Sequence, residues 1–286
     1  MLNAVENIGR IVTKVVSNFG RFGRFATNVV SSFGRFSRFA SGTLYWAFTG
    51  LRQWRSWQLL FPQFWEIGAR SLPVVLLTGT FVGMVIAVQA YGQFYSAGLA
   101  SQLGAIINIS VVRELGPVLA GVMLAGRVGG SLTAELGTMR ITEQIQALRS
   151  MGADPLRVLA GPRFLACLLM IPFLTVYTDL TGVFGGYFIC VEVYGVNAAD
   201  YWRYSQQVVD TWDVMSGLIR SFFFGGAIGM ISCYKGFHCQ RGASGVGRAC
   251  TEGFVLSFIA ILLLDFFLAV FLRAIYETIW GIVPIV

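Results

Sequence analysis

The chain has 286 residues, of which 56% are hydrophobic and only 12% are charged. A soluble domain carries about 25% charged residues, so this composition excludes a surface that faces water on every side and makes a lipid bilayer part of the solvent. The formal net charge of +7 comes from basic residues near the expected membrane boundaries, which indicates anionic lipid headgroups rather than a nucleic-acid partner.

The N-terminal region contains an internal repeat, in which SNFGRFGRFA at 17–26 returns as SSFGRFSRFA at 31–40. On a helix the phenylalanines share one face and the arginines the adjacent face, which is typical of a helix lying in the membrane interface. A basic tail without regular structure is the alternative, because glycines interrupt the repeat. With tryptophans following at 43–68, we expect an interfacial segment over 1–68 and a transmembrane domain over 69–286.

Five apolar stretches are long enough to cross a bilayer, which takes about 20 residues each. They cover roughly 71–95, 111–135, 157–190, 214–234 and 253–275. The fold class is therefore an all-α integral membrane protein. Glycines recur within these stretches, for example Gly79, Gly83 and Gly182, and we expect them to let helices pack closely.

The distribution of lysine and arginine predicts the orientation, because basic residues are retained on the cytoplasmic side. With the N-terminus in the cytoplasm, most basic residues lie inside, and only Arg113, Arg203, Arg220 and Arg273 lie in the outer half. Five spans then place the C-terminus on the periplasmic side of an inner membrane. The segment 192–213 becomes an acidic outer loop.

A polar interruption at 137–155, GTMRITEQIQALRSMGADP, separates the second and third apolar stretches on the cytoplasmic side. Ile141, Ile145, Leu148 and Met151 follow helical spacing, and Gly152 is placed to end the helix. Asp154 is placed to cap the next helix, with Pro155 as its first residue. A short amphipathic helix of this kind fits a groove on a soluble partner, and a loop lying on the bilayer is the alternative.

Four charged residues fall inside apolar stretches, where a charge costs several kcal/mol unless it is paired or hydrated. They are Arg113, Glu114, Arg220 and Asp265. Each of them is therefore a candidate functional residue. The alternative is that they form ion pairs that only hold helices together. Arg127 lies near a cytoplasmic end, where we interpret it as structural or as a snorkelling anchor.

Motifs for catalysis are missing from the sequence. GASGVG at 242–247 is not followed by GK[ST], so it is a flexible loop and not a nucleotide site. Cys233, His238, Cys239 and Cys250 match no standard zinc-finger spacing, and we expect no metal site. The chain is therefore expected not to be an enzyme, and the energy for any active process must come from a partner.

Residues 113–163, RELGPVLAGVMLAGRVGGSLTAELGTMRITEQIQALRSMGADPLRVLAGPR, resemble the signature region of the MlaE/YrbE permeases. Weaker similarity runs through FVGMVIAVQAY at 81–91, GVGRACTEG at 245–253 and LLLDFFL at 262–268. These permeases are the membrane subunits of Mla- and Mce-type ABC transporters of lipids. The resemblance covers about residues 60–275 and leaves out the N-terminal repeat.

The resemblance implies a homodimer, an ATPase subunit that binds ATP and magnesium, and a periplasmic MCE-domain protein that exchanges phospholipid or a related lipid with the permease. It implies a coupling helix at 141–153, and the candidate ATPase contacts are Ile141, Glu143, Gln144, Ile145, Leu148 and Met151. It also implies that Gln89 and Tyr91 line the lipid cavity with the four charged residues. In such a cavity Arg113 or Arg220 would bind the lipid phosphate, and Glu114 and Asp265 would balance the arginines when the cavity is empty.

Two other functions remain open from the residues alone. A secondary transporter driven by an ion gradient would use Asp265 as a proton site and would need no ATPase. A non-transporting scaffold would recruit soluble partners and would not need the charges inside the spans, which are expensive to keep.

Overall fold

The computed structural model describes residues 31–49 and 54–280, and within these ranges all regular structure is helical. The chain divides into two compact units, residues 1–45 and 46–286. The predicted division after residue 68 is a different one and stays a prediction. Much of the N-terminal repeat lies outside the described residues, whereas its second copy at 31–40 is helical, with Phe33, Arg35 and Arg38 exposed.

Five helical stretches of the second unit are long and apolar enough to cross a membrane, which confirms the predicted number. They are Gln58–Ser96, Ala100–Ile141, Leu156–Val193, Thr211–Phe237 and Ala243–Ile279. The chain is thus a multi-pass membrane protein.

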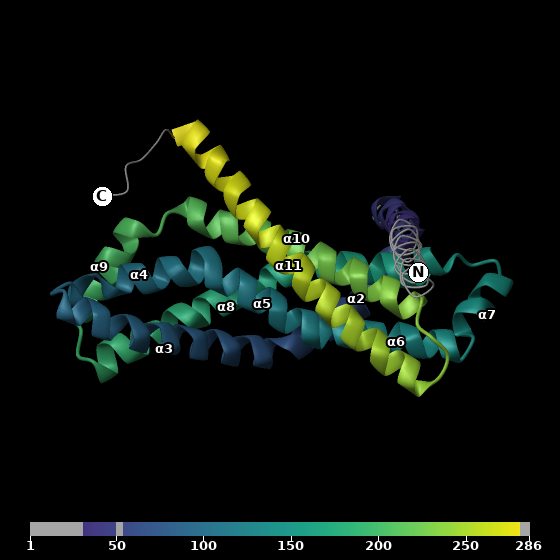
Figure 1. Cartoon of the computed structure of the whole chain (residues 1–286), viewed down its shortest axis with the longest axis horizontal. Coiled ribbons are helices and arrows are strands. Elements are labelled where there is room, and N and C mark those ends of the chain that lie inside the picture. The colour runs from purple at the N-terminus through teal and green to yellow at the C-terminus, as the bar shows by residue number, and fades with distance from the viewer. Residues whose placement is uncertain (1–30, 50–53, 281–286) are drawn as a thin grey trace, which may run out of the picture. The chain divides into compact units, whose positions relative to one another are not determined.

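The stretches are built from shorter elements (Figure 1). The first contains α2 (Trp54–Ile67), η1 (Ala69–Ser71) and α3 (Leu72–Ser96), and the second contains η2 (Ala100–Gln102), α4 (Leu103–Ser110), η3 (Val111–Leu115), α5 (Gly116–Leu124), η4 (Ala125–Gly129) and α6 (Gly130–Ile141). The third contains η5 (Leu156–Ala160), α8 (Gly161–Tyr187) and η6 (Phe188–Val193), and the last two are α10 (Thr211–Phe237) and α11 (Ala243–Trp280). Between them lie α7 (Gln144–Ser150) and α9 (Ala198–Val208).

Helix α8 lies at the centre of the bundle, where it packs against α2, α3, α5 and α10. Glycines allow its close contact with α3. A side chain at Gly83 would collide with the backbone of Gly182, and one at Gly185 would collide with Thr80. Apolar side chains gain nothing from leaving lipid for one another, so this fit of backbone against backbone is what holds the helices together. The expectation that glycines let the helices approach is confirmed.

Helix α11 crosses the other long helices obliquely and packs against α10, α6 and α5 (Figure 1). Large side chains remain exposed along its length, including Phe258, Leu263, Phe267 and Phe271. Exposed apolar residues of this kind are suited to lipid or to another membrane-embedded protein surface.

The expected outer loop at 192–213 is partly helical, because α9 occupies residues 198–208 within it. Asn197 caps this helix by accepting a hydrogen bond from the amide of Ala199. The second stretch also begins earlier than expected, at residue 100 instead of about 111. The added part of the second stretch contains α4, which packs against α9 and buries Asn108, a polar residue that interrupts the apolar pattern.

The α4–α9 contact contains a buried hydrogen-bond network. The Tyr201 hydroxyl donates to Oδ1 of Asn108 at 2.9 Å, and Nδ2 of Asn108 donates to the Ser205 hydroxyl at 2.8 Å. Burial raises the pKa of Tyr201 well above its usual value, so the phenol stays protonated and remains a donor. Because each of the three side chains has a hydrogen-bond partner, the network offsets the free-energy cost of burying three polar groups.

Replacing Tyr201 with phenylalanine leaves Oδ1 of Asn108 buried without its donor. We expect a loss of about 1–3 kcal/mol in the free energy of unfolding, measured in detergent by thermal or denaturant unfolding. Tyr204→Phe is the matched control, because no hydrogen bond of the Tyr204 hydroxyl is found among the described residues. Equal stability of the two variants would contradict a structural role for the network.

Candidate functional site

Two ion pairs connect three of the membrane-spanning stretches. Nη1 of Arg220 on α10 lies 3.4 Å from Oδ1 of Asp265 on α11. Nη1 of Arg113 on η3 lies 3.7 Å from Oδ1 of Asp213 at the start of α10. Asp213 and Arg220 are seven residues apart, so they lie on one face of α10, and this face receives Arg113 from one neighbour and Asp265 from another.

The two arginines differ in how far they are buried. The Arg220 side chain is 4% exposed and that of its partner Asp265 is 26% exposed, whereas the Arg113 side chain is 42% exposed. A guanidinium buried to that extent needs a carboxylate, since an unpaired charge at this depth is strongly unfavourable. Arg220 is therefore a fixed part of the site, and Arg113 is the arginine more open to a ligand.

Asp213, which pairs with Arg113, did not figure among the candidates from sequence. It is the third residue of a capping box, in which Asp210 caps α10 and Oδ2 of Asp213 accepts a hydrogen bond from the Asp210 amide at 3.1 Å. The signal that was available is the pair of aspartates three residues apart before an apolar run, which is typical of this cap.

Arg113 and Glu114 lie in η3, a short π-helix. Wider turns of this kind occur often at functional sites, because the extra residue turns side chains out of the regular helical pattern. Glu114 is exposed and has no ion-pair partner among the described residues, although its charge acts on Asp265. The structure thus brings together all four of the predicted charged residues, with Asp213 added.

Gln89 and Tyr91 lie apart from this cluster. Tyr91 stacks on Tyr194 with ring centroids 3.7 Å apart and on Tyr95 at 5.3 Å, and Gln89 is exposed on α3. Within the described residues, no hydrogen bond or ion pair joins either one to the charged residues. Their expected place in a lipid cavity came from the family resemblance alone and stays a prediction.

A further ion pair and a further carboxyl group inside the bundle were not among the candidates from sequence. Glu135 on α6 pairs with Arg163 on α8 at 2.6 Å, and the arginine is 5% exposed. Asp179 on α8 has a buried Oδ1 with no partner among the described residues, and it lies against Gly116, where a side chain would collide with it. A single carboxylate within the apolar run 171–190 was the signal available for Asp179.

The predicted coupling segment contains a helix, α7, which lies at one end of the bundle (Figure 1). The predicted helix bounds of 141–153 were wrong at both ends. Helix α7 covers only 144–150, because Glu143 adopts a left-handed backbone conformation with φ of 59° and Gly152 one with φ of 79°. Ile141 ends the preceding helix α6. A non-glycine residue in this conformation costs about 1–2 kcal/mol, so the turn at Glu143 is strained.

The side chains of the coupling segment divide into two groups. Ile145 is 6% exposed and holds α7 to the protein, with Ile141 and Leu148 half-buried. Met151 is 72% exposed at the end of the helix, and Glu143 and Gln144 are also exposed. An exposed methionine at the tip of a projecting helix is suited to a partner's groove, since its side chain adapts to the surface that it meets.

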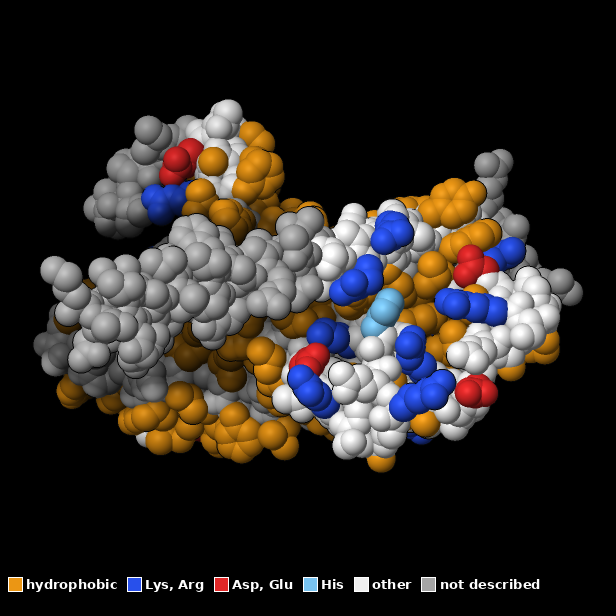
Figure 2. All heavy atoms as spheres, turned by 45° about the vertical axis from the view of Figure 1, so that its right-hand side comes forward, with side chains coloured by type: hydrophobic (Ala, Val, Ile, Leu, Met, Phe, Trp, Pro, Cys, Tyr) orange, Lys and Arg blue, Asp and Glu red, His pale blue; other side chains and the backbone are white. Residues whose placement is uncertain are grey.

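Asp154 anchors the segment that follows α7. Its Oδ1 accepts a hydrogen bond from the amide of Leu156 at 2.9 Å, which confirms the predicted cap, and its Oδ2 accepts one from Nε1 of Trp46 at 2.8 Å. The guanidinium of Arg157 lies 5.2 Å from the centre of the Trp46 ring. Figure 2 shows further Lys and Arg side chains gathered around the single histidine on the face that includes this end. Three exposed basic residues belong to the segments at this end, namely Arg149 on α7, Arg241 between α10 and α11, and Arg248 on α11.

Removing one member of the Arg220–Asp265 pair leaves the other charge uncompensated. We expect Asp265→Leu to lower the free energy of unfolding by about 3 kcal/mol, and Arg220→Met combined with Asp265→Leu to recover most of that loss. Unfolding in detergent measures both. A double variant as unstable as the single one would show that the pair is not coupled.

Comparison with known proteins places the chain among membrane permeases. The family model described as permease MlaE matches residues 60–271. A probable ABC transporter permease protein of Rickettsia conorii is 44% identical over 209 residues, which cover 73% of this chain and 79% of the relative. The intermembrane phospholipid transport system permease protein MlaE of Haemophilus influenzae is 36% identical over 227 residues, covering 79% of this chain and 87% of the relative.

Proposed function

Because the chain belongs to the MlaE permease family, we propose that it is the membrane subunit of an ATP-driven transporter that moves phospholipid or a related lipid. The family match and the names of the relatives support the permease role and the class of substrate. The observation that carries the lipid path is the pair of ion pairs inside the membrane-spanning stretches, since charges at that depth are kept only where they serve a purpose.

The lipid would enter at Arg113, whose side chain is partly exposed and whose guanidinium lies 3.7 Å from the carboxylate of Asp213. A lipid phosphate at this position would take the place of the Asp213 carboxylate and form a charge-assisted hydrogen bond with Arg113. The guanidinium would therefore have an anionic partner both before and after the lipid binds. Arg220 lies deeper and is held by Asp265, where it adds positive potential without leaving its partner. The negative charge of Glu114 would repel the lipid phosphate, which would weaken its binding and help its release.

Gln89 and Tyr91 complete the proposed path if two copies of the chain assemble, since each lies on α3 away from the charges of its own protomer. A homodimer is the assembly that we propose. The large exposed side chains of α11 suit such an assembly as well as lipid.

ATP and Mg²⁺ would be bound by a separate ATPase subunit, which the names of the relatives as ABC transporter permeases support. We propose that α7 and the flanking residues Glu143 and Met151 contact this subunit on the cytoplasmic side. The surrounding arginines support the cytoplasmic placement, because basic residues are retained on that side. With five spans the N-terminus is then cytoplasmic, and the C-terminus is periplasmic, on the side where an MCE-domain protein would exchange lipid.

The lipid path is tested by ATP-dependent transfer of a fluorescent phospholipid in proteoliposomes that contain the chain and its ATPase. We expect Arg113→Gln to lower the transfer rate by about tenfold, the loss of one charged hydrogen bond. Arg273→Gln is the control, because Arg273 is exposed and its ion-pair partner among the described residues is Glu277, one turn away. Unchanged transfer by Arg113→Gln, with the protein folded, would reject the path.

The coupling role is tested at Met151. An aspartate there places a charge in an apolar contact, so we expect Met151→Asp to abolish co-purification of the ATPase, while Met151→Leu retains it. Both variants should fold, since Met151 is 72% exposed. Normal ATPase binding by Met151→Asp would show that α7 is not the docking element.

A further inference from the structure

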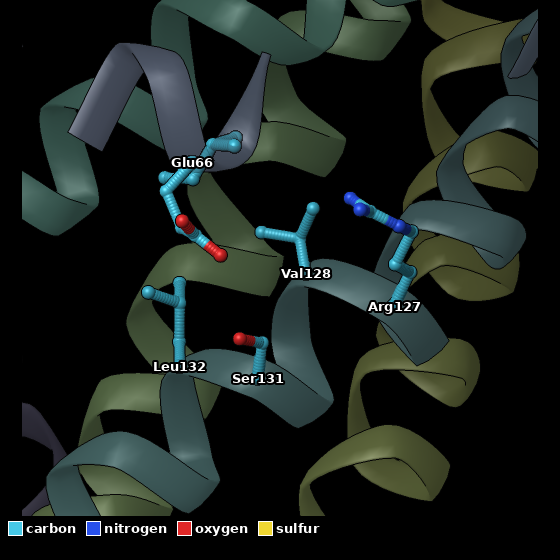
Figure 3. Close-up of a pocket in the computed structure, with 6 residues that line it drawn as sticks. Glu66, Arg127, Val128, Ser131 and Leu132 are labelled. Atoms are coloured by element: carbon cyan, nitrogen blue, oxygen red, sulfur yellow. The ribbon is translucent and has the colours of Figure 1, made fainter. Parts of the chain in front are cut away.

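A polar cavity lies between α2, η4 and the start of α6, and none of the ion-paired residues of the proposed lipid path lines it. Its volume is about 240 Å³, and its lining consists of Glu66, Ile67, Arg127, Val128, Ser131 and Leu132. Figure 3 shows the Glu66 carboxylate reaching from α2 toward Ser131 and Leu132, and the Arg127 side chain on the other side of Val128. The cavity thus has one acidic and one basic wall.

The basic wall lacks a counter-charge. Nη1 of Arg127 donates a hydrogen bond to the hydroxyl of Ser71, which is fully buried but neutral. No carboxylate in the described part of the chain lies within ion-pair distance of Arg127. A guanidinium within an apolar helical stretch needs an anion, and its fork of donors matches the oxygens of a phosphate.

The acidic wall lies close by but does not neutralise the arginine. Glu66 pairs with Arg70 at 2.7 Å on the exposed surface of its own chain segment, with side-chain exposures of 38% and 60%. The Glu66 carboxylate is therefore held at the rim of the cavity. It lines the same cavity as Arg127 but does not contact the guanidinium. An opening with separated negative and positive walls suits a ligand that carries both charges.

The position of the cavity along the membrane normal indicates which ligand is available to it. Helix α3 has 25 residues, about 37 Å at 1.5 Å per residue, and alone crosses a hydrocarbon core of about 30 Å. The preceding residues therefore lie at the level of the lipid headgroups. Trp65 is 67% exposed and Arg70 is exposed beside Glu66, which is typical of that level.

The cavity floor is apolar and its approach is open. Ile67 is 1% exposed and Leu132 is 2% exposed, so they form a packed floor beneath the polar groups. Gly130, three residues after Arg127, has nothing within 4 Å of the position that a side chain would take. A headgroup can therefore reach Arg127 from the membrane surface while its acyl chains stay in the bilayer.

We propose that this cavity binds a zwitterionic phospholipid headgroup of the phosphoethanolamine type, with the phosphate at Arg127 and the ammonium at Glu66. The site is separate from the proposed lipid path, whose charges lie on η3, α10 and α11. It needs neither an ATPase nor transport, so it can be tested independently of them. Arg127, interpreted from sequence as a structural or snorkelling residue, becomes a ligand of lipid phosphate.

The test uses a cysteine in the cavity as a local reporter. Ser131 is exposed and lines the cavity, whereas four of the five native cysteines are buried and the fifth is half-buried. The full chain carrying Ser131→Cys is placed in nanodiscs of phosphatidylethanolamine or of phosphatidylglycerol, and the rate of maleimide labelling is measured. We expect labelling to be about tenfold slower in phosphatidylethanolamine, because the bound headgroup covers the thiol.

Glu66→Gln should remove the difference between the two lipids, and Arg127→Gln should make labelling fast in both. Ser150→Cys on α7 is the matched control, being exposed and outside the cavity, and its rate should be independent of the lipid. Equal rates for Ser131→Cys in the two lipids would overturn the proposal. So would equal protection by inorganic phosphate in phosphatidylglycerol discs, which would show a phosphate site and not a lipid site. Glu66→Gln keeps the test decisive if Arg127→Gln does not fold.

Discussion

The close approach of α3 and α8 is the contact on which the rest of the protein depends. Between helices in lipid there is little hydrophobic gain, so association relies on fit. A side chain at Gly79 or Gly83 on α3, or at Gly185 on α8, would collide with the backbone of the other helix. Helix α8 in turn supports α5 and α10, the helices that carry or flank the charged cluster.

Charge in a medium without water is the second constraint. Arg163 and Arg220 are almost fully buried, and each lies within ion-pair distance of a carboxylate from another helix. Arg113 and Arg127 are less buried. Arg113 has a carboxylate at 3.7 Å, and Arg127 donates a hydrogen bond to a neutral hydroxyl. The contrast separates arginines that hold helices together from those left free to meet an anion, and it is the physical basis for placing lipid phosphate at the second kind.

Backbone geometry, and not charge, defines the end of the protein that carries α7. Two left-handed residues, Glu143 and Gly152, limit α7 to seven residues, and Asp154 ties the chain that follows to Trp46 and to the start of α8's stretch. A short helix held at both ends moves as one body. That rigidity is suited to the coupling role that we propose for α7, and the packing of Ile145 offsets the strain at Glu143.

The sequence by itself determined the number of spans, the presence of glycines that permit close helix packing and the presence of charges inside the spans, because hydropathy and residue size are local properties of each helix. Only the tertiary structure decided that Asp213 pairs with Arg113, that α9 satisfies Asn108, and that Glu66 and Arg127 line one cavity. These contacts join residues far apart in the chain, so their partners depend on how the helices pack. The length of α7 could not be predicted from the apolar spacing either. The spacing continues through Ile141 and Ile145, but the left-handed backbone conformation of Glu143 interrupts the helix between them.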